Sequence, residues 1–304
     1  MSKSFLQTKE WLDFQKHLGR AAWRFDNGKI AANVVTHKIP LGKNYLYVPH
    51  GPVLTLDNFD SGVRNEIDNF LSHLKNLAKE NRSIFVKLEP LSDSVTELVF
   101  RKRMKKSDSL QPQRTVVLDL GLSEEELLSR MHQKTRYNIN LSSKKGLEFR
   151  QSDDVEKFWR ILKKTAKKDK FQTHDKDYYF RLFSYFKGRE DIRTELFLVE
   201  LDGKAVAGAF VMFYGDTVYY LHGAMDRDYK ELMAPYFMHW QMIKHAKSSG
   251  HHYYDFWGID ARRWPGVTRF KLGWGGQTKE YPGSFDIPIS KFWYLIYRIA
   301  RKIF

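Results

Sequence analysis

The sequence of 304 residues contains no cysteine. This absence excludes a disulfide framework and any metal site built from thiolates, and it permits a reducing compartment. No stretch reaches the roughly 18 apolar residues that a bilayer-spanning helix needs. The N-terminal Met1-Ser2-Lys3-Ser4-Phe5 is followed by mainly polar residues and lacks the apolar core of a secretory signal peptide. We therefore expect a cytoplasmic chain without a membrane-spanning segment.

Signatures of several catalytic classes are also missing. The sequence has no Gly-x-Ser-x-Gly motif and no P-loop, and it has no glycine-rich dinucleotide fingerprint between a strand and a helix. His251 and His252 are adjacent, whereas paired metal ligands on a helix are four residues apart. We therefore expect no metal and no cofactor.

Acidic residues are fewer than basic ones: the sequence has 36 Asp and Glu and 51 Lys and Arg, which gives a net charge of +15. An excess of this size predicts polyanionic partners such as tRNA, an anionic membrane surface or a phosphorylated substrate. A solvated basic surface without a specific partner is the alternative. The length allows one large domain or two of ordinary size.

Hydrophobic spacing predicts helices and strands in the first half of the chain. A helix at residues 60–81 has apolar residues three and four apart, and the charged residues 101–106 predict a solvated connector. The Gln-Pro-Gln sequence at 111–113 predicts a switch between domains. The other expected elements are a strand end at 5–8, a short helix at 11–18, and strands at 31–39, 45–48, 51–54 and 84–90.

The second half alternates in the same way. Ser123 and Glu126 have the spacing of a capping box that opens a helix. Because helices alternate with strands around one sheet, we expect an α/β or α+β fold, and the order of elements loosely echoes that of the first half. The other expected helices are 134–146, 155–168, 177–186 and 234–248, and the expected strands are 115–120, 196–201, 206–214, 218–222 and 253–257.

The most informative stretch lies near the C-terminal end. Residues 253–260 (YYDFWGID) predict a buried strand that runs into a loop, and Pro265-Gly266 is expected to break the chain. Lys271 follows, between apolar neighbours and before three glycines. Such glycines let the backbone approach another strand or a ligand. A lysine in this setting either extends to solvent or meets an anion.

These motifs and their order resemble the closing segment of the FemABX family, at residues 254–259, 269–276 and 280–286. Members of that family are aminoacyltransferases that build the peptidoglycan cross-bridge from aminoacyl-tRNA. The resemblance implies two tandem GNAT-like (acyl-CoA N-acyltransferase-like) domains in a compact form without a coiled-coil arm. We expect the first domain at residues 1–112 with a return segment at 283–304, and the second at 113–282.

The resemblance also implies roles at the catalytic centre. It places Phe270 and Lys271 there, with Lys271 offering positive charge to a developing oxyanion or to the ribose oxygen of tRNA. The reaction is aminolysis of an activated ester, so the enzyme mainly aligns the reactants and stabilises negative charge. The acceptor amine must lose a proton. Asp255 and Asp260 are the nearest candidate bases, although an aspartate at a strand end often caps a loop.

Other positions correspond to substrate contacts of the family. A cation that meets the diphosphate of the peptidoglycan precursor falls at His174, a tyrosine at Tyr178 and a second aromatic contact near His222. A lysine near the end of the first helix falls at or beside Gln15, and Lys16 is the adjacent candidate. His50 replaces the cation of a Tyr-x-Pro-(Arg/Lys)-Gly-Pro signature at residues 47–52. A neutral histidine is a weaker phosphate ligand than arginine, although it still donates a hydrogen bond.

A basic segment at residues 134–146 resembles another family signature. It predicts a helix that ends at a glycine, with Tyr137 and Leu141 facing inward and the cations facing outward. Two interpretations remain open: an electrostatic seat for tRNA or substrate phosphate, and cations that suit the negative end of a helix. The candidate phosphate-binding residues are Lys134, Arg136, Lys144 and Lys145.

Residues 291–304 predict a basic amphipathic helix with Lys291, Arg298, Arg301 and Lys302 on one side. This pattern is typical of a helix at a membrane surface. A helix packed on the core of the first domain is the alternative.

Together, the residues and the resemblance predict a monomeric aminoacyltransferase, with peripheral membrane contact through residues 291–304. Its co-substrate would be aminoacyl-tRNA and its acceptor lipid II or UDP-MurNAc-pentapeptide. Two rival functions are an acyl-CoA-dependent N-acyltransferase of the same fold and a non-catalytic RNA-binding protein.

Overall fold

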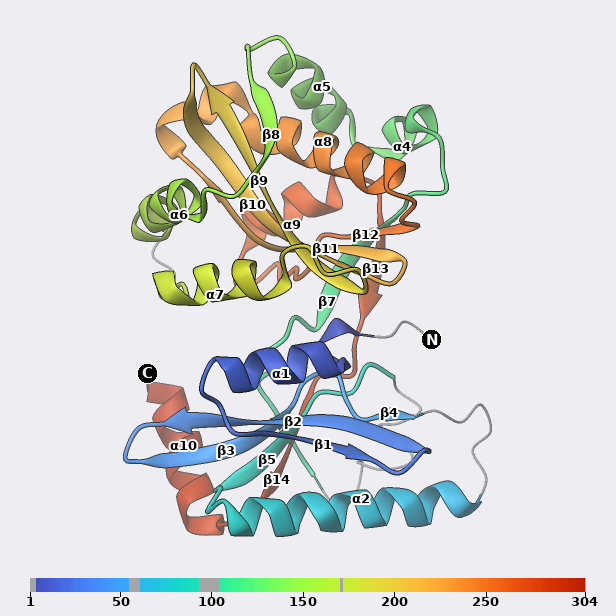
Figure 1. Ribbon diagram of the computed structural model, residues 1–304, viewed down its shortest axis with the longest axis vertical. Helices are drawn as coiled ribbons and strands as arrows, with labels where there is room; N and C mark the ends of the chain where they lie inside the picture. Colours follow the sequence, from blue (N-terminus) through green and yellow to red (C-terminus); the bar gives the residue numbers. More distant parts are fainter. Residues whose placement is uncertain (1–3, 55–60, 93–103, 170–171, 304) are drawn as a thin grey trace. The chain divides into compact units, whose positions relative to one another are not determined.

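The structure is a computed structural model that describes residues 4–54, 61–92, 104–169 and 172–303. The chain divides into two compact units (Figure 1). The first comprises Met1–Gln113 and Glu280–Phe304, and the second comprises Arg114–Lys279. The segment from the end of the sequence thus completes the first unit.

The first unit is built on a seven-stranded sheet in the order β1-β2-β3-β5-β14-β6, with β4 paired to β2. The pair β3–β5 is parallel, and β14 joins β5 and β6 in antiparallel register. The strands are β1 (Ala22–Asp26), β2 (Ile30–Ile39), β3 (Lys43–Val48), β4 (Val53–Leu54), β5 (Phe85–Leu88), β6 (Lys105–Ser107) and β14 (Ser284–Pro288).

Alternation along the strands decides which helix covers each face. Leu46 and Val48 of β3 pack with the apolar side of α2 (Ser61–Glu80), whereas Tyr45 and Tyr47 face the opposite side and join the cluster that holds α10 (Lys291–Ile303). The short helix α1 (Lys9–His17) lies against β1 and β2. Figure 1 shows α1 and α2 on opposite sides of this sheet.

The second unit has another seven-stranded sheet, in the order β13-β7-β12-β11-β10-β9-β8. The pair β11–β12 is parallel, while β8 to β11 form an antiparallel meander. The strands are β7 (Arg114–Asp119), β8 (Glu148–Ser152), β9 (Ile192–Leu201), β10 (Lys204–Tyr214), β11 (Thr217–Met225), β12 (Tyr253–Asp255) and β13 (Gln277–Glu280).

Helices cover both faces of this second sheet. Leu196 and Leu198 of β9 pack with α6 (Val155–Asp169) and α7 (Lys176–Phe186). Phe197 and Val199 face the other way, toward the cluster that contains α8 (Ala234–Ser248). The unit is therefore a three-layer α/β/α sandwich. The remaining helices are α4 (Glu124–Arg130), α5 (Gln133–Ser142), η2 (Arg227–Leu232) and α9 (Pro265–Leu272).

The two units share one topology. In each, an antiparallel meander of three strands leads through a helix to a fourth strand that lies parallel to the third: β1-β2-β3, α2 and β5 in the first unit, and β9-β10-β11, α8 and β12 in the second. The fourth strand then pairs antiparallel with a strand from elsewhere in the chain, β14 or β7. The echo between the two halves of the sequence is confirmed at the level of topology.

Several local predictions need correction. Residues 5–7 form a 3-10 helix (η1, Phe5–Gln7) rather than a strand end, because the Ser4 hydroxyl accepts from the backbone N–H of Leu6. Residues 105–107 form the edge strand β6 instead of a connector, and 101–103 lie outside the described residues. Pro265 begins helix α9 rather than breaking the chain, since proline suits the first helical turn. The capping box of Ser123 and Glu126 is confirmed.

No helix in the described ranges is long and apolar enough to cross a membrane. Helix α10 packs on the sheet through Tyr294, whose ring meets Phe85 with a centroid separation of 5.3 Å. The same helix leaves Phe292, Leu295 and Ile299 exposed. It therefore combines a docked side with an open apolar side.

Candidate active site

Lys271 is the only lysine of α9 and lies almost entirely inside the second unit, with 7% of its surface exposed. Its Nζ donates to the carbonyl oxygen of Gly258 at 2.8 Å and to that of Trp257 at 3.3 Å. The side chain therefore does not extend to solvent. It binds the backbone of the loop that follows β12.

That loop has an unusual backbone conformation. Trp257 adopts a φ of 57°, a left-handed conformation that costs a bulky residue roughly 1–3 kcal/mol. Asp255 stabilises the turn, because its carboxylate accepts from the backbone N–H of Trp257 at 2.7 Å and from the hydroxyl of Thr115. Strand β12 and its aspartate thus fix the two carbonyl groups that hold Lys271.

The surroundings of Lys271 lower the pKa of its ammonium group. Burial lowers the pKa of Lys271 to about 8, and the Asp255 carboxylate partly opposes this effect. The Nζ also lies 5.5 Å from the ring centroid of Tyr220. No carboxylate among the described residues forms an ion pair with Lys271. Its ammonium group is therefore positive charge in a water-poor setting, where it stabilises a developing anion strongly.

The two aspartates considered as bases both cap backbone groups. Burial raises the pKa of Asp255, which is enclosed by its contacts to Thr115 and Trp257. Asp260 accepts from the backbone N–H groups of Arg262 and Arg263, and these hydrogen bonds lower its pKa. Both contacts are of the loop-capping kind.

Phe270 packs inside an aromatic cluster beside Lys271. Its ring lies 5.0 Å from Tyr236 and 5.3 Å from His239, both on α8. His239 was not singled out in the sequence. It is completely buried, its Nδ1 lies 3.0 Å from the Tyr254 hydroxyl, and burial with the charge of Lys271 holds its pKa well below the ordinary value. The sequence could have indicated that His239 is buried, because position 239 lies on the apolar side of a predicted helix.

The glycines after Lys271 approach the chain's own atoms. A Cβ at Gly273 would lie 2.6 Å from the Thr135 hydroxyl, and one at Gly275, where φ is 77°, would collide with the carbonyl of Arg130. The backbone N–H of His132 also donates to the carbonyl of Gly273 at 2.9 Å. Of the two explanations for these glycines, close packing against another segment is the one observed.

Three of the residues predicted to contact substrate gather in a second cluster (the 174/178/222 cluster). The rings of His174 and Tyr178 stack at 3.9 Å, and His222 lies 5.9 Å and 6.1 Å from them. The buried ring of Tyr179 lies behind, 5.1 Å from His222. Burial, and secondarily His174, lowers the pKa of His222 to about 3, so this imidazole is neutral near pH 7.

A β-bulge in β11 separates the surroundings of Tyr220 from those of His222. The register with β10 shifts there, because Phe210 pairs with His222 while Val211 pairs with Tyr220. A bulge inverts the alternation of side chains. Tyr220 therefore meets His239 of α8, with ring centroids 4.4 Å apart, whereas His222 faces α7.

The basic segment around α5 is oriented differently from the prediction. Tyr137 is 63% exposed, and Thr135 and Ile139 are the buried positions. Arg136 does not point outward, because its guanidinium donates to the carbonyl groups of Met131 and Leu128 at the end of α4. Three of the four candidate cations remain on the surface: Lys134, Lys144 and Lys145.

Two further predicted positions belong to the first unit. Lys16 is exposed near the end of α1 and pairs with Asp13 at 3.2 Å. His50 is buried, its Nδ1 lies 2.8 Å from the Ser4 hydroxyl, and burial lowers its pKa to about 3. His50 is therefore a neutral structural residue rather than a surface cation. In the part of the chain that the structure describes, no group of three or more acidic or histidine side chains could hold a metal ion.

Comparison with known proteins identifies relatives along the whole chain. A lipid II:glycine glycyltransferase of Staphylococcus epidermidis is 24% identical, over 98% of this chain and 90% of the relative. The homologous protein of Staphylococcus aureus strain USA300, with the same name, is 23% identical over 94% of this chain and 88% of its own length. The first alignment spans 385 positions, more than the 304 residues of this chain.

Solved structures support the fold. The crystal structure of FemX superposes with a TM-score of 0.78 at 22% identity and covers 96% of this chain and 94% of that one. A tandem GNAT protein from the clavulanic acid biosynthesis pathway gives a TM-score of 0.57 at 10% identity, over 92% and 94%. The predicted mixed α/β fold with tandem GNAT-like units is therefore confirmed. The sequence also matches the FemAB family over residues 1–99, 99–205 and 198–302, so the chain belongs to the FemAB family of aminoacyltransferases.

Proposed function

We propose that this chain transfers an aminoacyl group from aminoacyl-tRNA to the side-chain amine of a peptidoglycan stem peptide on a lipid-linked precursor. The names of its staphylococcal relatives support lipid II as the class of acceptor. The observation that carries the proposal is Lys271, a buried ammonium group whose hydrogen bonds within the described residues all go to backbone carbonyl groups.

The proposed step is aminolysis of an ester. The neutral acceptor amine attacks the ester carbonyl carbon, a C–N bond forms, and the carbonyl oxygen gains negative charge. The C–O bond to the tRNA ribose then breaks, and the proton that the amine releases ends on the ribose oxygen. The ammonium group of Lys271 stabilises the negative charge on either oxygen, while Phe270, the preceding residue of α9, packs against the aromatic cluster of Tyr236 and His239.

Binding roles are proposed for the other predicted positions. The 174/178/222 cluster offers imidazole and phenol hydrogen-bond donors and aromatic faces for the acceptor. In the first unit, the exposed Lys16 is proposed as a substrate-binding cation. The exposed Lys134, Lys144 and Lys145 would neutralise phosphates of tRNA, a contribution that weakens as salt is added. The net charge of +15 favours a polyanionic donor.

A cytoplasmic enzyme with a lipid-linked acceptor must work at the membrane surface. We assign that contact to residues 291–304, on the inner face of the cell membrane. Helix α10 supports this assignment, because its exposed side carries large apolar residues.

The acyl-CoA alternative would need a glycine-rich loop whose backbone N–H groups are open to a pyrophosphate. The stretch of this sequence that comes closest to such a pyrophosphate-binding loop is 269–275, and its glycines pack against Thr135 and Arg130. This packing favours aminoacyl-tRNA as the donor. The RNA-binding alternative differs in another way, since it predicts tRNA binding without turnover.

One experiment separates these functions. The protein is incubated with a pool of charged tRNAs and either lipid-linked or nucleotide-linked muropeptide, and the acceptor mass is measured. We expect a gain of one aminoacyl group that Lys271→Met slows by about 10²–10³-fold. A gain only when acyl-CoA replaces tRNA would overturn the choice of donor, and tRNA binding without any gain would favour an RNA-binding protein.

A further inference from the structure

A polar cavity lies between the end of α10 and the edge of the sheet in the first unit. It has a volume of about 310 Å³, enough for a group the size of a phosphate with a short polyol. Four cations and two carboxylates line it, so its net charge is positive. The lining residues are Lys87, Lys106, Ser107, Asp108, Leu110, Asp286, Tyr297, Arg298 and Arg301.

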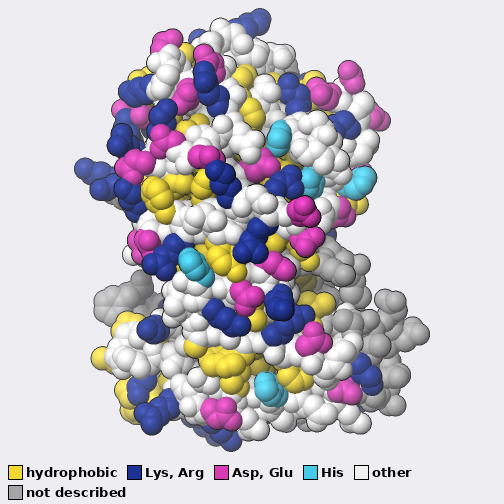
Figure 2. Space-filling view, in the orientation of Figure 1, with side chains coloured by type: hydrophobic (Ala, Val, Ile, Leu, Met, Phe, Trp, Pro, Cys, Tyr) yellow, Lys and Arg dark blue, Asp and Glu magenta, His cyan; other side chains and the backbone are white. Residues whose placement is uncertain are grey.

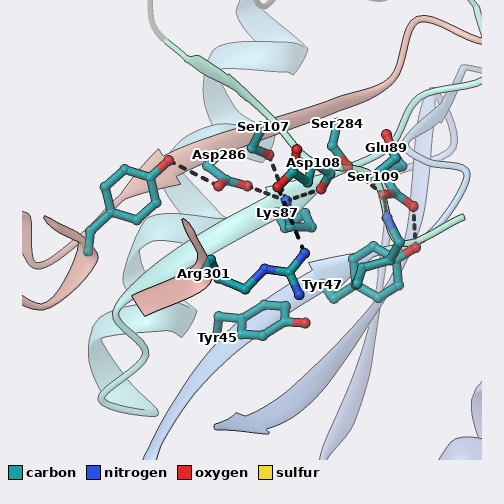
Figure 3. Close-up of polar contacts among 12 residues, drawn as sticks. Tyr45, Tyr47, Lys87, Glu89, Ser107, Asp108, Ser109, Ser284, Asp286 and Arg301 are labelled. Atoms are coloured by element: carbon teal, nitrogen blue, oxygen red, sulfur yellow. Dashed lines mark hydrogen bonds and ion pairs between the residues drawn. The ribbon is translucent and has the colours of Figure 1, made fainter. Parts of the chain in front are cut away.

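The floor of this cavity is a buried ion pair that is complete without a ligand (Figure 3). Lys87 is 2% exposed, and its Nζ lies 2.9 Å from Asp286. The same ammonium group donates to the Ser107 hydroxyl at 2.6 Å and to the carbonyl of Asp108 at 3.0 Å. Tyr294 of α10 donates to the other oxygen of Asp286 at 3.0 Å. This network holds the sheet edge and α10 together, and these two elements form the walls of the cavity.

The rim carries the cations that are available to a ligand. Lys106 and Arg298 are exposed and form no ion pair within the described residues. In the described part of the chain, the one ion pair of Arg301 is the long contact with Asp108 at 3.9 Å. Two of these cations are arginine side chains, whose planar guanidinium groups bind phosphate oxygens in pairs. The rim is therefore suited to a phosphate group.

The same helix presents an apolar ridge next to the cavity. Phe292, Leu295, Ile296 and Ile299 have helical spacing and are 66%, 59%, 37% and 51% exposed. Arg298 is three residues from Leu295 and adjacent to Ile299, so the cavity rim borders the ridge. Figure 2 shows hydrophobic side chains beside Lys and Arg side chains in the region where Figure 1 places α10.

The other border of the ridge has interfacial character as well. Trp293 is half-buried, and Lys43 Nζ lies over its ring at 4.3 Å. Leu41, in the turn that leads to Lys43, is 77% exposed. Tryptophan and lysine at the margin of an apolar surface are typical of helices that lie in a membrane interface.

From this geometry we propose that the cavity beside α10 binds the phosphate headgroup of an anionic phospholipid while the Phe292–Ile299 ridge enters the membrane interface. The occupant is a lipid because the phosphate-binding rim and the apolar ridge border one another on one helix. The inference builds on the proposed membrane contact. It does not depend on the transfer reaction, because lipid binding needs neither tRNA nor acceptor.

The test is cosedimentation of the full chain with vesicles of phosphatidylglycerol in phosphatidylcholine, and with vesicles of phosphatidylcholine alone. We expect preference for the anionic vesicles. Removing two cations in Lys106→Ala/Arg298→Ala should weaken binding by about five-fold per cation, and Leu295→Gln/Ile299→Gln should weaken it as well. All four side chains are exposed, so these variants should keep the wild-type thermal midpoint.

The matched control is Lys75→Ala/Lys79→Ala, which removes two exposed cations of α2 in the same unit. It should change vesicle binding by less than about two-fold. An equal loss in this control, or no loss in Lys106→Ala/Arg298→Ala, would overturn the headgroup site. Binding of inorganic phosphate that needs Lys106 and Arg298, without preference for anionic vesicles, would overturn the lipid assignment. Aminoacyl transfer measured in parallel with a nucleotide-linked acceptor reports separately on the proposed function.

Discussion

The ammonium group of Lys271 lies 2.8 Å from the carbonyl oxygen of Gly258, so a residue of α9 is fixed to the loop after β12. Burial lowers the pKa of this lysine to about 8. Because the loop conformation depends on Asp255 and on the left-handed Trp257, a change at any of these positions should alter the placement of the charge.

The first prediction concerns the charge itself. Lys271→Met keeps the length and apolar stem but removes the ammonium group. If Lys271 stabilises a developing oxyanion, kcat should fall by about 10²–10³-fold, as when one such donor is lost elsewhere, and tRNA affinity should stay within about two-fold. Single-turnover transfer and filter binding would measure the two effects. A variant that keeps wild-type kcat would exclude Lys271 from catalysis.

The second prediction concerns pH. The reaction needs a neutral acceptor amine and a protonated Lys271. Below pH 8 the rate should rise with pH, because more of the acceptor amine is neutral. Above about pH 8 the rate should level off, because the loss of the Lys271 proton then offsets the further gain in neutral amine. The profile of log(kcat/KM) against pH would reveal this break.

Lys271→Arg is the matched control for that profile, since arginine stays protonated in this range. Any remaining activity should continue to rise past pH 8. A wild-type profile without a break near pH 8 would contradict the assignment of Lys271 as the protonated group.

The overall architecture could be predicted from the sequence because it depends on local patterns. The periodicity of α2 and the apolar strands β9 and β10 gave their positions. The orientation of α5 could not be predicted, because its face toward the core consists of Thr135, Asn138, Ile139 and Ser142, mostly small or polar side chains that carry little hydrophobic signal.

The contacts within the candidate site could not be predicted from the sequence either. Lys271 was found through the resemblance, but its partners are backbone carbonyl groups, and a sequence pattern does not encode which carbonyl a side chain will meet. Burial of a charged residue in α9 is a tertiary effect of the surrounding aromatic cluster. Likewise, the bulge in β11 makes Tyr220 and His222 face different ways. A leucine at position 221 does not predict a bulge.

The third prediction concerns the acceptor. His174 stacks on Tyr178 where the resemblance implies a cation for the precursor diphosphate. His174→Arg should tighten binding of a nucleotide-linked acceptor by about five-fold, because a charge-assisted hydrogen bond is worth about 1 kcal/mol more than a neutral one. The KM for UDP-linked muropeptide would measure the gain. His174→Gln, which is uncharged, is the control, and an equal gain there would contradict an effect of charge.

The last prediction separates structural cations from cations that bind RNA. Arg136 donates to the carbonyl groups of Met131 and Leu128, so Arg136→Ala should reduce the free energy of unfolding by about 1–3 kcal/mol. Lys144→Ala/Lys145→Ala removes exposed charges and should leave that free energy within about 0.5 kcal/mol. It should instead weaken tRNA binding and reduce the salt dependence of that binding, since fewer counterions are released.

Chemical denaturation and salt titration of tRNA affinity would measure these two effects on the same set of proteins. The control is Lys163→Ala/Lys167→Ala, which removes two cations from α6 in the same unit. If that control reduces the salt slope as much as Lys144→Ala/Lys145→Ala, then the end of α5 contributes only to the general positive field of the chain. If the α5 variant alone reduces it, the exposed end of this helix is where the tRNA backbone lies, because a released counterion reports a local phosphate contact.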